Sequence, residues 1–533
     1  MIVKFIRLTR WIYQYCIRSF NMIINPNTTI DFFPDLGISE NDSLYFPSVE
    51  SKNNYFNSLQ KIASVTNYSY NRRERGVLKV QLPMSTAYKI GYMRYKNSSF
   101  ENFWFYAFVD SVEYDNNETA IIRFHIDVMT TYMGVFELGQ CFIERQHTVS
   151  DKIGENITDE GLGTGEYIIE QEHRTGFFNE YMISIVYLPS EGDEYQGNYY
   201  NGVYSGCVIE QYETAEMANA AIDSFVKNNK LDSIVAIYML PAHYTAKWAE
   251  SEITGDTVMF DKPYNSIDGY VPRNKKLFCY PYKFLDVFNS EGESSQYMYE
   301  FFNTLPDAAS SGKYSFLLYG VANANPQIVC APQAYKNDNG DAGANWEEQL
   351  SMSHFAQCAI AVDSYKAYLA QVNSTFLHDA AKTAATGAVM TAIGSDSQGS
   401  EYGTKMLRDI TSILVDNTVR PKSPATSKGS TVSDVGVAAK LKDFYFYEKC
   451  ITKNYAKMID SYFDSFGYAI RKVGTPNMNA RPHWTYCKTI GCVVHGNLPA
   501  DDARQIERMF DNGIRFWKNA DELGNYSLDN SPK

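Results

Sequence analysis

Aromatic side chains gather in short runs that turn residues interrupt, and this pattern limits the possible folds more than any other feature of the sequence. Residues 104–114 (WFYAFVDSVEY) and 119–133 (TAIIRFHIDVMTTYM) are largely apolar, and Asp115, Asn116 and Asn117 separate them. Aromatic runs on both sides of an Asn/Asp cluster are typical of a β-hairpin. The chain holds 41 Tyr and 31 Phe, residue types that favour half-buried strands and wide contacts between subunits. The sequence therefore predicts a β-rich protein.

Residues 176–262 show a different order of elements. The runs YMISIVYLP, CVIEQYE and SIVAIYMLP predict strands, and TAEMANAAIDSFVKNNK between the last two has apolar residues at helical spacing. Thr214 stands where the N-cap of that helix is expected, with Glu216 close behind it. Strand, helix and strand in this order predict a small α/β domain inserted between β segments.

The rest of the chain mixes helices with strands. A short helix is expected at 57–65 and a longer one at 356–378, and KNYAKMIDSYFDSFGY and ADDARQIERMFDNGIRFW predict helices near the C-terminus. Strands are expected at KLFCYPYKFLDVF, YSFLLYGV and HWTYCKTIGCVV. A low-complexity stretch rich in Ala, Thr, Gly and Ser runs from about 380 to 437.

Charge and cysteine content exclude some classes of protein. The formal net charge is −14, which argues against a protein that grips nucleic acid, because such binding depends on Lys and Arg at the phosphates. The nine cysteines are scattered, odd in number and without a CxxC pair. We therefore expect neither a disulfide framework nor a zinc site. We also expect the protein to be assembled in a reducing cytosol.

The chain carries no recognisable catalytic motif. HExxH, GxSxG and Walker A patterns are absent and the eight histidines are spread out. The segment 337–348 nearly matches a calcium loop, but Ala342 stands where that loop needs Gly, so a polar turn is favoured. We predict no catalytic residue, no metal ligand and no cofactor.

Three stretches together carry a family resemblance. They are residues 104–133 followed by 141–147 (CFIERQH), residues 274–292 (NKKLFCYPYKFLDVFNSEG), and residues 459–468 (IDSYFDSFGY) followed by 479–492 and 497–517. In this order and spacing they resemble the tail knob, or distal tail tube, proteins of small short-tailed bacteriophages. The motif residues that the resemblance marks as structural are Trp104, Asp127, Arg145, His147, Tyr280, Arg481, Trp484 and Trp517.

The resemblance implies a structural protein and not an enzyme. It implies several β-barrel or sandwich-like tube domains, a hexamer mounted on the portal and collar proteins, and DNA that passes through the lumen without sequence-specific binding. It also implies a distal loop that plugs the exit and meets the host membrane. The protein would then lie in the distal tail of the virion after assembly in the host cytoplasm.

Sequence and resemblance together predict a β-rich, mixed α+β fold. It would have several β-barrel or sandwich-like tube domains, one inserted small α/β domain and a long distal loop region. The predicted division is an N-terminal extension at 1–21, a β-rich tube domain at 22–175, the inserted domain at 176–262, a second tube segment at 263–355, a helix and distal loop at 356–440, and a C-terminal α+β tube segment at 441–533. Basic residues interrupt the extension, and its longest uncharged run, Trp11 to Ile17, is too short to cross a bilayer. We therefore expect residues 1–21 to be an extension or a misplaced start.

Residues 383–395 (TAATGAVMTAIGS) carry no charge and lie where the family has its tip loops. One interpretation is a plug or membrane-active segment, and the other is a flexible loop or a buried helix of small residues. Thirteen residues cannot span a hydrocarbon core of roughly 30 Å as one helix, but they could insert as a re-entrant element. The candidate residues for such contact are Thr383, Ala384, Gly387, Val389, Met390 and Ile393.

Two other functions stay open at this point. The first is an adhesin of the tail that binds a cell-wall receptor, to which aromatic surfaces are suited, although repeats and a trimerising coiled coil are absent from the sequence. The second is a cell-wall hydrolase, which would need paired carboxylates or a Cys/His pair to converge.

Overall fold

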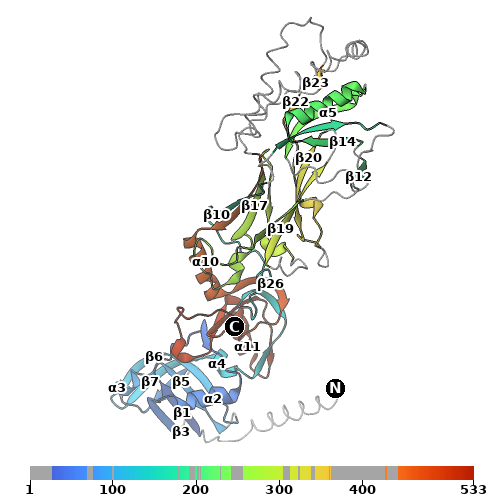
Figure 1. Ribbon diagram of the computed structural model, residues 1–533. Helices are drawn as coiled ribbons and strands as arrows, with labels where there is room; N and C mark the ends of the chain where they lie inside the picture. The colour runs from blue at the N-terminus through green and yellow to red at the C-terminus, as the bar shows by residue number, and fades with distance from the viewer. Residues whose placement is uncertain are drawn as a thin grey trace, which may run out of the picture. The chain divides into compact units, whose positions relative to one another are not determined.

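A computed structural model gives the structure, and its strands far outnumber its helices (Figure 1). It describes residues 27–68, 76–98, 101–176, 181–190, 199–200, 203–204, 206–228, 230–241, 256–303, 312–321, 325–337, 342–358, 360–361, 427–428 and 442–532. The chain divides into two compact units, of which unit 1 is Met1–Leu162 with Met458–Lys533 and unit 2 is Gly163–Lys457. The β-rich, mixed α+β fold predicted from the sequence is confirmed.

Unit 1 contains a six-stranded antiparallel sheet, and the predicted aromatic hairpin lies in it. The strand order is β3-β1-β5-β6-β7-β4. In that order the bounds are Ala63–Tyr68, Thr28–Phe33, Tyr92–Lys96, Phe105–Asn116, Thr119–Ile126 and Val77–Val80. Asn116 pairs with Thr119 across the tight end of the β6–β7 hairpin, which confirms the predicted hairpin, with its turn at 117–118.

The second sheet of unit 1 joins strands from both parts of the chain. Its order is β2-β29-β27-β9-β26, with bounds Asp42–Leu44, Ile514–Trp517, Trp484–Ile490, Cys141–Gln146 and Tyr468–Gly474. Strands β2 and β29 are parallel, and the other pairs are antiparallel. A separate pair joins β8 (Phe136–Leu138) to β28 (Val494–Gly496).

Helices complete unit 1. They are α2 (Val49–Ser58), α3 (Met84–Ala87), α4 (Val128–Tyr132), α11 (Ala500–Asn512) and the 3-10 turn η9 (Ala520–Glu522). The boundary between the units falls within α10 (Lys453–Phe466). The largest core cluster of unit 1 contains the fully buried Trp484 and Trp517, whose ring centroids are 5.0 Å apart. Rings of this size supply a large share of the buried apolar area of a core.

Unit 2 is built on three four-stranded sheets. The order in the first is β10-β25-β17-β18, with bounds Tyr167–Arg174, Phe444–Ile451, Lys283–Asn289 and Ser294–Tyr297. The order in the second is β16-β19-β20-β21, with bounds Asp256–Asp261, Lys313–Val321, Gln327–Gln333 and Leu350–Met352. The order in the third is β14-β11-β15-β22, with bounds Val208–Tyr212, Tyr181–Tyr187, Ile234–Pro241 and Gln357–Cys358.

Short elements connect these sheets. They are α5 (Ala215–Lys227), the 3-10 turns η2 (Leu231–Ser233), η4 (Lys275–Phe278), η5 (Tyr299–Phe301) and η8 (Trp346–Glu348), and the strand pairs β12 (Tyr199–Tyr200) with β13 (Val203–Tyr204) and β23 (Ile360–Ala361) with β24 (Ser427–Lys428).

The third sheet of unit 2 is apolar on both faces. Alternate residues of β15 belong to different clusters, since Ile237 packs with α5 whereas Tyr238 packs with the first two sheets. Helix α5 contributes Ala218 and Ile222 to the first of these clusters and covers that face of the sheet (Figure 1). The helix is the one predicted, and its N-cap Thr214 accepts a hydrogen bond from the backbone N–H of Met217.

The helix predicted at 57–65 is wrong. The helix here is α2, which starts earlier because Ser48 and Ser51 form a reciprocal capping box. Leu59 takes extended backbone and ends it. The following residues form β3, whose Val65 and Thr66 are β-branched and favour a strand.

The helix predicted at 356–378 is wrong at its start. Residues 357–358 form β22, which pairs with Ile237 and Tyr238 of β15. The backbone N–H of Met239 also donates to the carbonyl oxygen of Ala356. Pairing at the edge of an existing sheet has overridden the helical spacing of the sequence. Residues 362–378 lie outside the described residues, as do residues 1–21.

Candidate functional site

The turn between β17 and β18 is folded by its own side chains. The Asn289 side-chain oxygen accepts hydrogen bonds from the backbone N–H groups of Glu291 (3.0 Å) and Glu293 (2.8 Å). The Asn289 amide nitrogen donates to the Glu293 carboxylate and to the carbonyl oxygen of Ser351. An Asn that bonds its own backbone two residues on is a strong turn former. The arrangement fixes where the Glu291 side chain lies.

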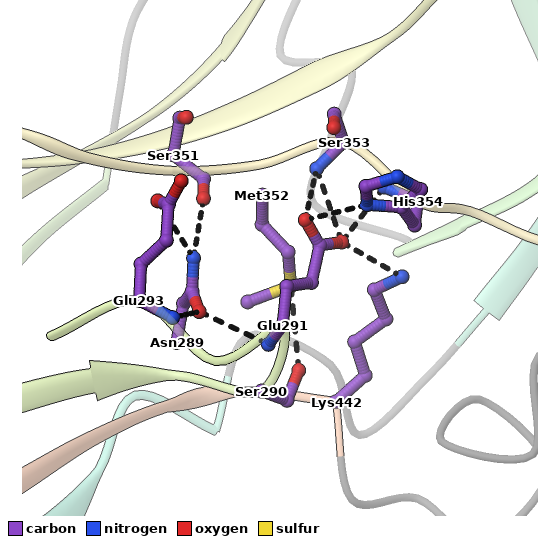
Figure 2. Close-up of polar contacts among 9 residues, drawn as sticks. All are labelled: Asn289, Ser290, Glu291, Glu293, Ser351, Met352, Ser353, His354 and Lys442. Carbon is purple, nitrogen blue, oxygen red and sulfur yellow. Dashed lines mark hydrogen bonds and ion pairs between the residues drawn. The ribbon is translucent and has the colours of Figure 1, made fainter.

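The Glu291 carboxylate gathers donors from two distant parts of the chain (Figure 2). It accepts from the backbone N–H of Ser353 (3.0 and 3.1 Å) and of His354 (2.7 Å). His354 also places its ring Nδ1 at 3.0 Å, and Lys442 places its Nζ at 3.1 Å. We call Glu291 with these three partners the Glu291 clamp.

The charges of the Glu291 clamp are unequally buried. The Lys442 side chain is 2 % exposed and that of Glu291 14 %, whereas His354 is 79 % exposed. Burial acts to raise the pKa of the Glu291 carboxyl, but hydrogen bonds from Ser353 and His354 and the charge of Lys442 hold that pKa below its ordinary value of 4.5. A buried lysine needs such a partner, because an uncompensated charge is costly in a protein interior.

The partners of Glu291 in the clamp lie close, along the chain, to the two ends of the distal segment. Ser353 and His354 follow β21 and precede β22, on the side of the chain that leads toward residue 362. Lys442 directly precedes β25, where the chain enters the first sheet of unit 2 again. One carboxylate thus holds both chain ends that flank residues 362–426 and 429–441. The candidate plug residues Thr383, Ala384, Gly387, Val389, Met390 and Ile393 belong to that segment and lie outside the described residues.

Three residues of the sequence motifs meet at the C-terminal end of α10. Arg145 donates to the carbonyl oxygen of Gly467 (2.7 Å) and forms an ion pair with Glu160. The indole nitrogen of Trp484 donates to the carbonyl oxygen of Asp464 (2.8 Å). His147 reaches the same end of the helix, as described next. The last carbonyls of a helix have no partner within the helix, so these side chains satisfy them.

His147 is fully enclosed and has a defined proton position. Its Nδ1 accepts from the backbone N–H of Tyr486 at 2.8 Å, so the ring proton sits on Nε2. That Nε2–H donates to the carbonyl oxygens of Phe463 and Asp464, each at 3.1 Å. Burial, followed by the charge of Arg481, lowers the pKa of His147 to about 3. The imidazole is therefore neutral in the folded protein.

Other motif residues also lie in unit 1. Trp517 donates from its indole nitrogen to Asp42 at 3.0 Å. Arg481 is buried, donates to the carbonyl oxygen of Asn530 and lies 5.9 Å from the centre of the Tyr468 ring. Trp484 packs on Trp517.

Asp127 and Trp104 stabilise the region beside the aromatic hairpin. Asp127 caps α4 by accepting from the backbone N–H of Thr130 (2.9 Å), and it also accepts from the Tyr92 hydroxyl (2.8 Å). Trp104 lies under Arg94, whose guanidinium carbon is 4.1 Å from the ring centre. Cation–π contacts of this kind contribute roughly 0.5–2 kcal/mol.

Lys52 binds the other end of α4. Its ammonium donates to the carbonyl oxygens of Thr130, Thr131 and Met133 at 2.8 to 3.1 Å. Burial lowers the pKa of Lys52 to about 8. Nothing in the sequence pattern marked this lysine, since only the fold brings it to the carbonyls.

Tyr280 lies in unit 2 and is half exposed. It precedes Pro281 in a cis peptide bond, and its backbone N–H donates to the Glu300 carboxylate at 3.0 Å. Its ring packs edge-on against Phe284.

In the described part of the chain, no group of three or more His, Cys, Asp or Glu side chains could hold a metal ion. Residues 338–341 of the calcium-loop match lie outside the described residues, and Glu348 at its far end pairs with Lys336 at 2.7 Å. Among the described helices, none has the length and apolar character needed to cross a membrane.

Comparison with known proteins gives two family matches. Residues 244–531 match the model of the C-terminal domain of the tail knob protein gp9 of Bacillus phage phi29. Residues 26–137 match the N-terminal model of caudoviral major tail proteins.

Curated relatives match along nearly their whole length. The tail knob protein gp9 of Bacillus phage phi29 is 23% identical, with 94% of this chain and 98% of the relative covered. Its counterpart in Bacillus phage PZA gives the same identity and coverage. The gp9 protein of Bacillus phage B103 is also 23% identical, with 91% of this chain and 95% of the relative covered.

A solved structure shares the fold. The tail knob protein gp12 of bacteriophage C1 superposes with a TM-score of 0.62 over 94% of this chain and 99% of that chain. The sequence identity is 13%, so this likeness concerns the fold alone.

Proposed function

The chain belongs to the family of the tail knob protein gp9 of Bacillus phage phi29, and on that premise we propose that identical copies of it close into a hexameric conduit for genome ejection. It is a structural tail knob protein of a short-tailed phage, located in the virion tail. The finer claims about the ring, the lumen and the tip are our proposal. The observation that carries it is the family match over residues 244–531, together with the gp9 relative that matches over 94% of this chain.

The proposed mechanism depends on shape and not on bond-breaking chemistry. Sheets with open edges are stable in a closed ring, where neighbouring copies cover those edges. An overall acidic chain repels phosphates, so DNA would slide through a lumen without binding to its wall. We propose that collar and portal-side proteins of the tail hold the ring, and that assembly takes place in the host cytoplasm.

The distal segment is the proposed functional end. We propose that residues 380–437 form the tip loops, which plug the exit and contact the host membrane. The Glu291 clamp supports this role, because it fixes both chain ends of that segment to the rigid β17–β18 turn. A segment that must face the envelope needs such a fixed base.

Imaging of the purified protein tests the ring. We expect negative-stain micrographs with sixfold particles and a central hole. Trimers would favour the adhesin as the alternative function, and solitary particles without a pore would contradict the conduit. Clearing of a cell-wall suspension by the protein would instead indicate a hydrolase.

Leakage of dye from liposomes tests the membrane contact. Val389→Asp together with Ile393→Asp should abolish leakage, because a charge in each copy makes insertion into hydrocarbon costly. Val271→Asp places the same charge at an exposed position of unit 2 and should leave leakage unchanged. Unchanged leakage in the double variant would exclude insertion of this segment.

A further inference from the structure

An exposed apolar row crosses three adjacent strands of unit 1. Val473 of β26 and Ile490 of β27 both stand directly opposite Phe142 of β9. Directly opposed residues of antiparallel strands point to the same face of the sheet. Val473 is 70%, Ile490 57% and Phe142 37% exposed. We call these three residues the apolar row.

The apolar row is held rigidly. The Asp511 carboxylate of α11 accepts from the Thr489 hydroxyl and from the backbone N–H groups of Gly491 and Cys492, on both sides of Ile490. Beside the row, Lys488 and Glu144 neutralise each other at 2.9 Å. A preformed apolar surface on fixed strands is a feature of interaction sites, since isolated proteins rarely expose contiguous apolar patches.

The row ends at an open sheet edge with basic residues. Strand β26 is the last strand of its sheet in the described part of the chain. Arg471 and Lys472 of this strand are exposed next to Val473. An open edge offers unpaired backbone groups to another strand. The basic side chains select for an acidic one.

Strand β10 of unit 2 has the complementary character. It is also the edge strand of its sheet among the described residues. Tyr167 and Ile169, two positions apart and so on one face of the strand, are 40% and 54% exposed. Glu166, directly before this strand, is exposed and makes its first end acidic, whereas the charge of Glu172 is neutralised by Arg174 at 3.0 Å.

We propose that β10 of a second copy of this chain pairs along the edge of β26, where Ile169 and Tyr167 extend the apolar row and Glu166, on the other face from Tyr167, meets Lys472. The inference rests on the assembly of identical copies proposed above, and it names one contact of that assembly. The contact is head-to-tail, with different surfaces on the two copies, which is the kind that closes into rings. A stable interface needs about 800 Å² from each partner, so this strand pair is one part of a larger contact.

The mass distribution of the purified full-length protein tests the contact. Val473→Asp puts a charge in the apolar row and should reduce the multimer population at least tenfold at equal concentration. Val271→Asp is the matched control, because Val271 is also 70% exposed and lies outside both surfaces. Circular dichroism should show that both variants keep their strands, since the side chains are exposed.

A second test exchanges the charges of one residue pair across the contact. Its result does not depend on whether one single variant folds. Lys472→Glu and Glu166→Lys should each weaken the multimer, and the double variant should recover it. Mixing Val473→Cys chains with Ile169→Cys chains should give a disulfide-linked pair between the two chains under oxidation, which neither variant gives alone.

The outcomes separate this inference from the proposed function. A multimeric wild-type protein whose Val473→Asp variant stays multimeric, or a double charge variant without recovery, overturns the β26–β10 contact alone. A wild-type protein that stays monomeric at all concentrations overturns the ring as well as the contact.

Discussion

At the scale of residues, single buried side chains determine how the stability of unit 1 depends on pH. His147 is the best example, because one imidazole joins the C-terminal end of α10 to the backbone of Tyr486. The sequence motif marked His147 and Arg145 without their partners. The backbone groups of Phe463, Gly467 and Tyr486 that these two side chains bind lie more than three hundred positions away, so only the fold could supply them.

Acid should destabilise unit 1 through His147. The pKa of His147 is lowered to about 3 in the folded state, against 6.5 for the free side chain. The neutral form is thus favoured by folding, and its stabilising contribution is complete above pH 6.5 and lost as the pH falls toward 3. The expected slope is at most about 1.4 kcal/mol per pH unit.

Thermal unfolding between pH 7 and pH 4 measures this effect. His147→Gln should flatten the loss of stability on acidification. His495→Gln, which removes an exposed histidine, should leave the slope as it is. An equal slope in wild type and His147→Gln would show that His147 does not cause the acid sensitivity.

Gly467 should tolerate no side chain. Its φ is +65°, and a Cβ there would lie 2.3 Å from the backbone carbonyl of Gln146. Gly161 has almost the same φ, +66°, but nothing within 4 Å of a Cβ. Gly161→Ala should therefore cost only about 1 kcal/mol for its backbone conformation, whereas Gly467→Ala should cost about 2–4 kcal/mol. Chemical denaturation of both variants measures their free energies of unfolding. An equal decrease in the two variants would contradict the close contact at Gly467.

At the scale of elements, the β17–β18 hairpin also binds residues outside its own strands. Glu291 in its turn binds Ser353 and His354, and it forms an ion pair with Lys442. The Glu291 clamp was not predicted from the sequence, because its members lie in separate parts of the chain and share no motif.

Removing the charge of Glu291 should loosen both flanks of the distal segment. Glu291→Gln removes the carboxylate charge that pairs with the Lys442 ammonium, and we expect the free energy of unfolding of unit 2 to fall by about 1–3 kcal/mol. Hydrogen exchange at the backbone amides of Ser353 and His354 should become faster. Glu347→Gln, at an exposed carboxylate of η8, is the control and should change neither quantity.

The same clamp has a defined dependence on pH. The pKa of Glu291 is held below 4.5 in the folded state, so its contribution is complete above 4.5 and is lost as the pH falls below that value. Protection of the Ser353 and His354 amides that is equal at pH 7 and at pH 3 would contradict this role.

Local signals predicted some elements and misled on others. Thr214 followed by apolar residues at helical spacing gave α5 correctly, because cap and spacing agree there. The prediction of a helix at 57–65 was wrong because the capping box of Ser48 and Ser51 starts the helix earlier in the chain. The helix expected from 356 failed because β15 offered a sheet edge, and such distant pairing is not encoded in the local pattern.

At the scale of the whole molecule, each unit has its own core. The clusters around Trp484 and around Ile122 belong to unit 1, and those around Phe316 and Ile222 belong to unit 2. Separate cores favour separate unfolding, because contacts within each unit decide its stability. The division into six segments expected from the sequence stays a prediction at a finer level than these two units.

Hydrogen exchange in increasing denaturant tests the independence of the units. His147→Gln should speed exchange in the peptides of unit 1 alone, and Glu291→Gln in those of unit 2 alone. If each variant changes both units to the same extent, the two units unfold together.

The parallel pairing of β2 with β29 sets an order on biosynthesis. Asp42 to Leu44 are translated before their partners Arg515 to Trp517, and the whole of unit 2 is translated between them. The five-stranded sheet of unit 1 therefore stays incomplete until Trp517 has left the ribosome, when the described strands of unit 2 have already emerged. A product terminated before Ile514 would carry a finished unit 2 and an unfinished unit 1, and it would be a substrate for cellular proteases before it could enter a virion.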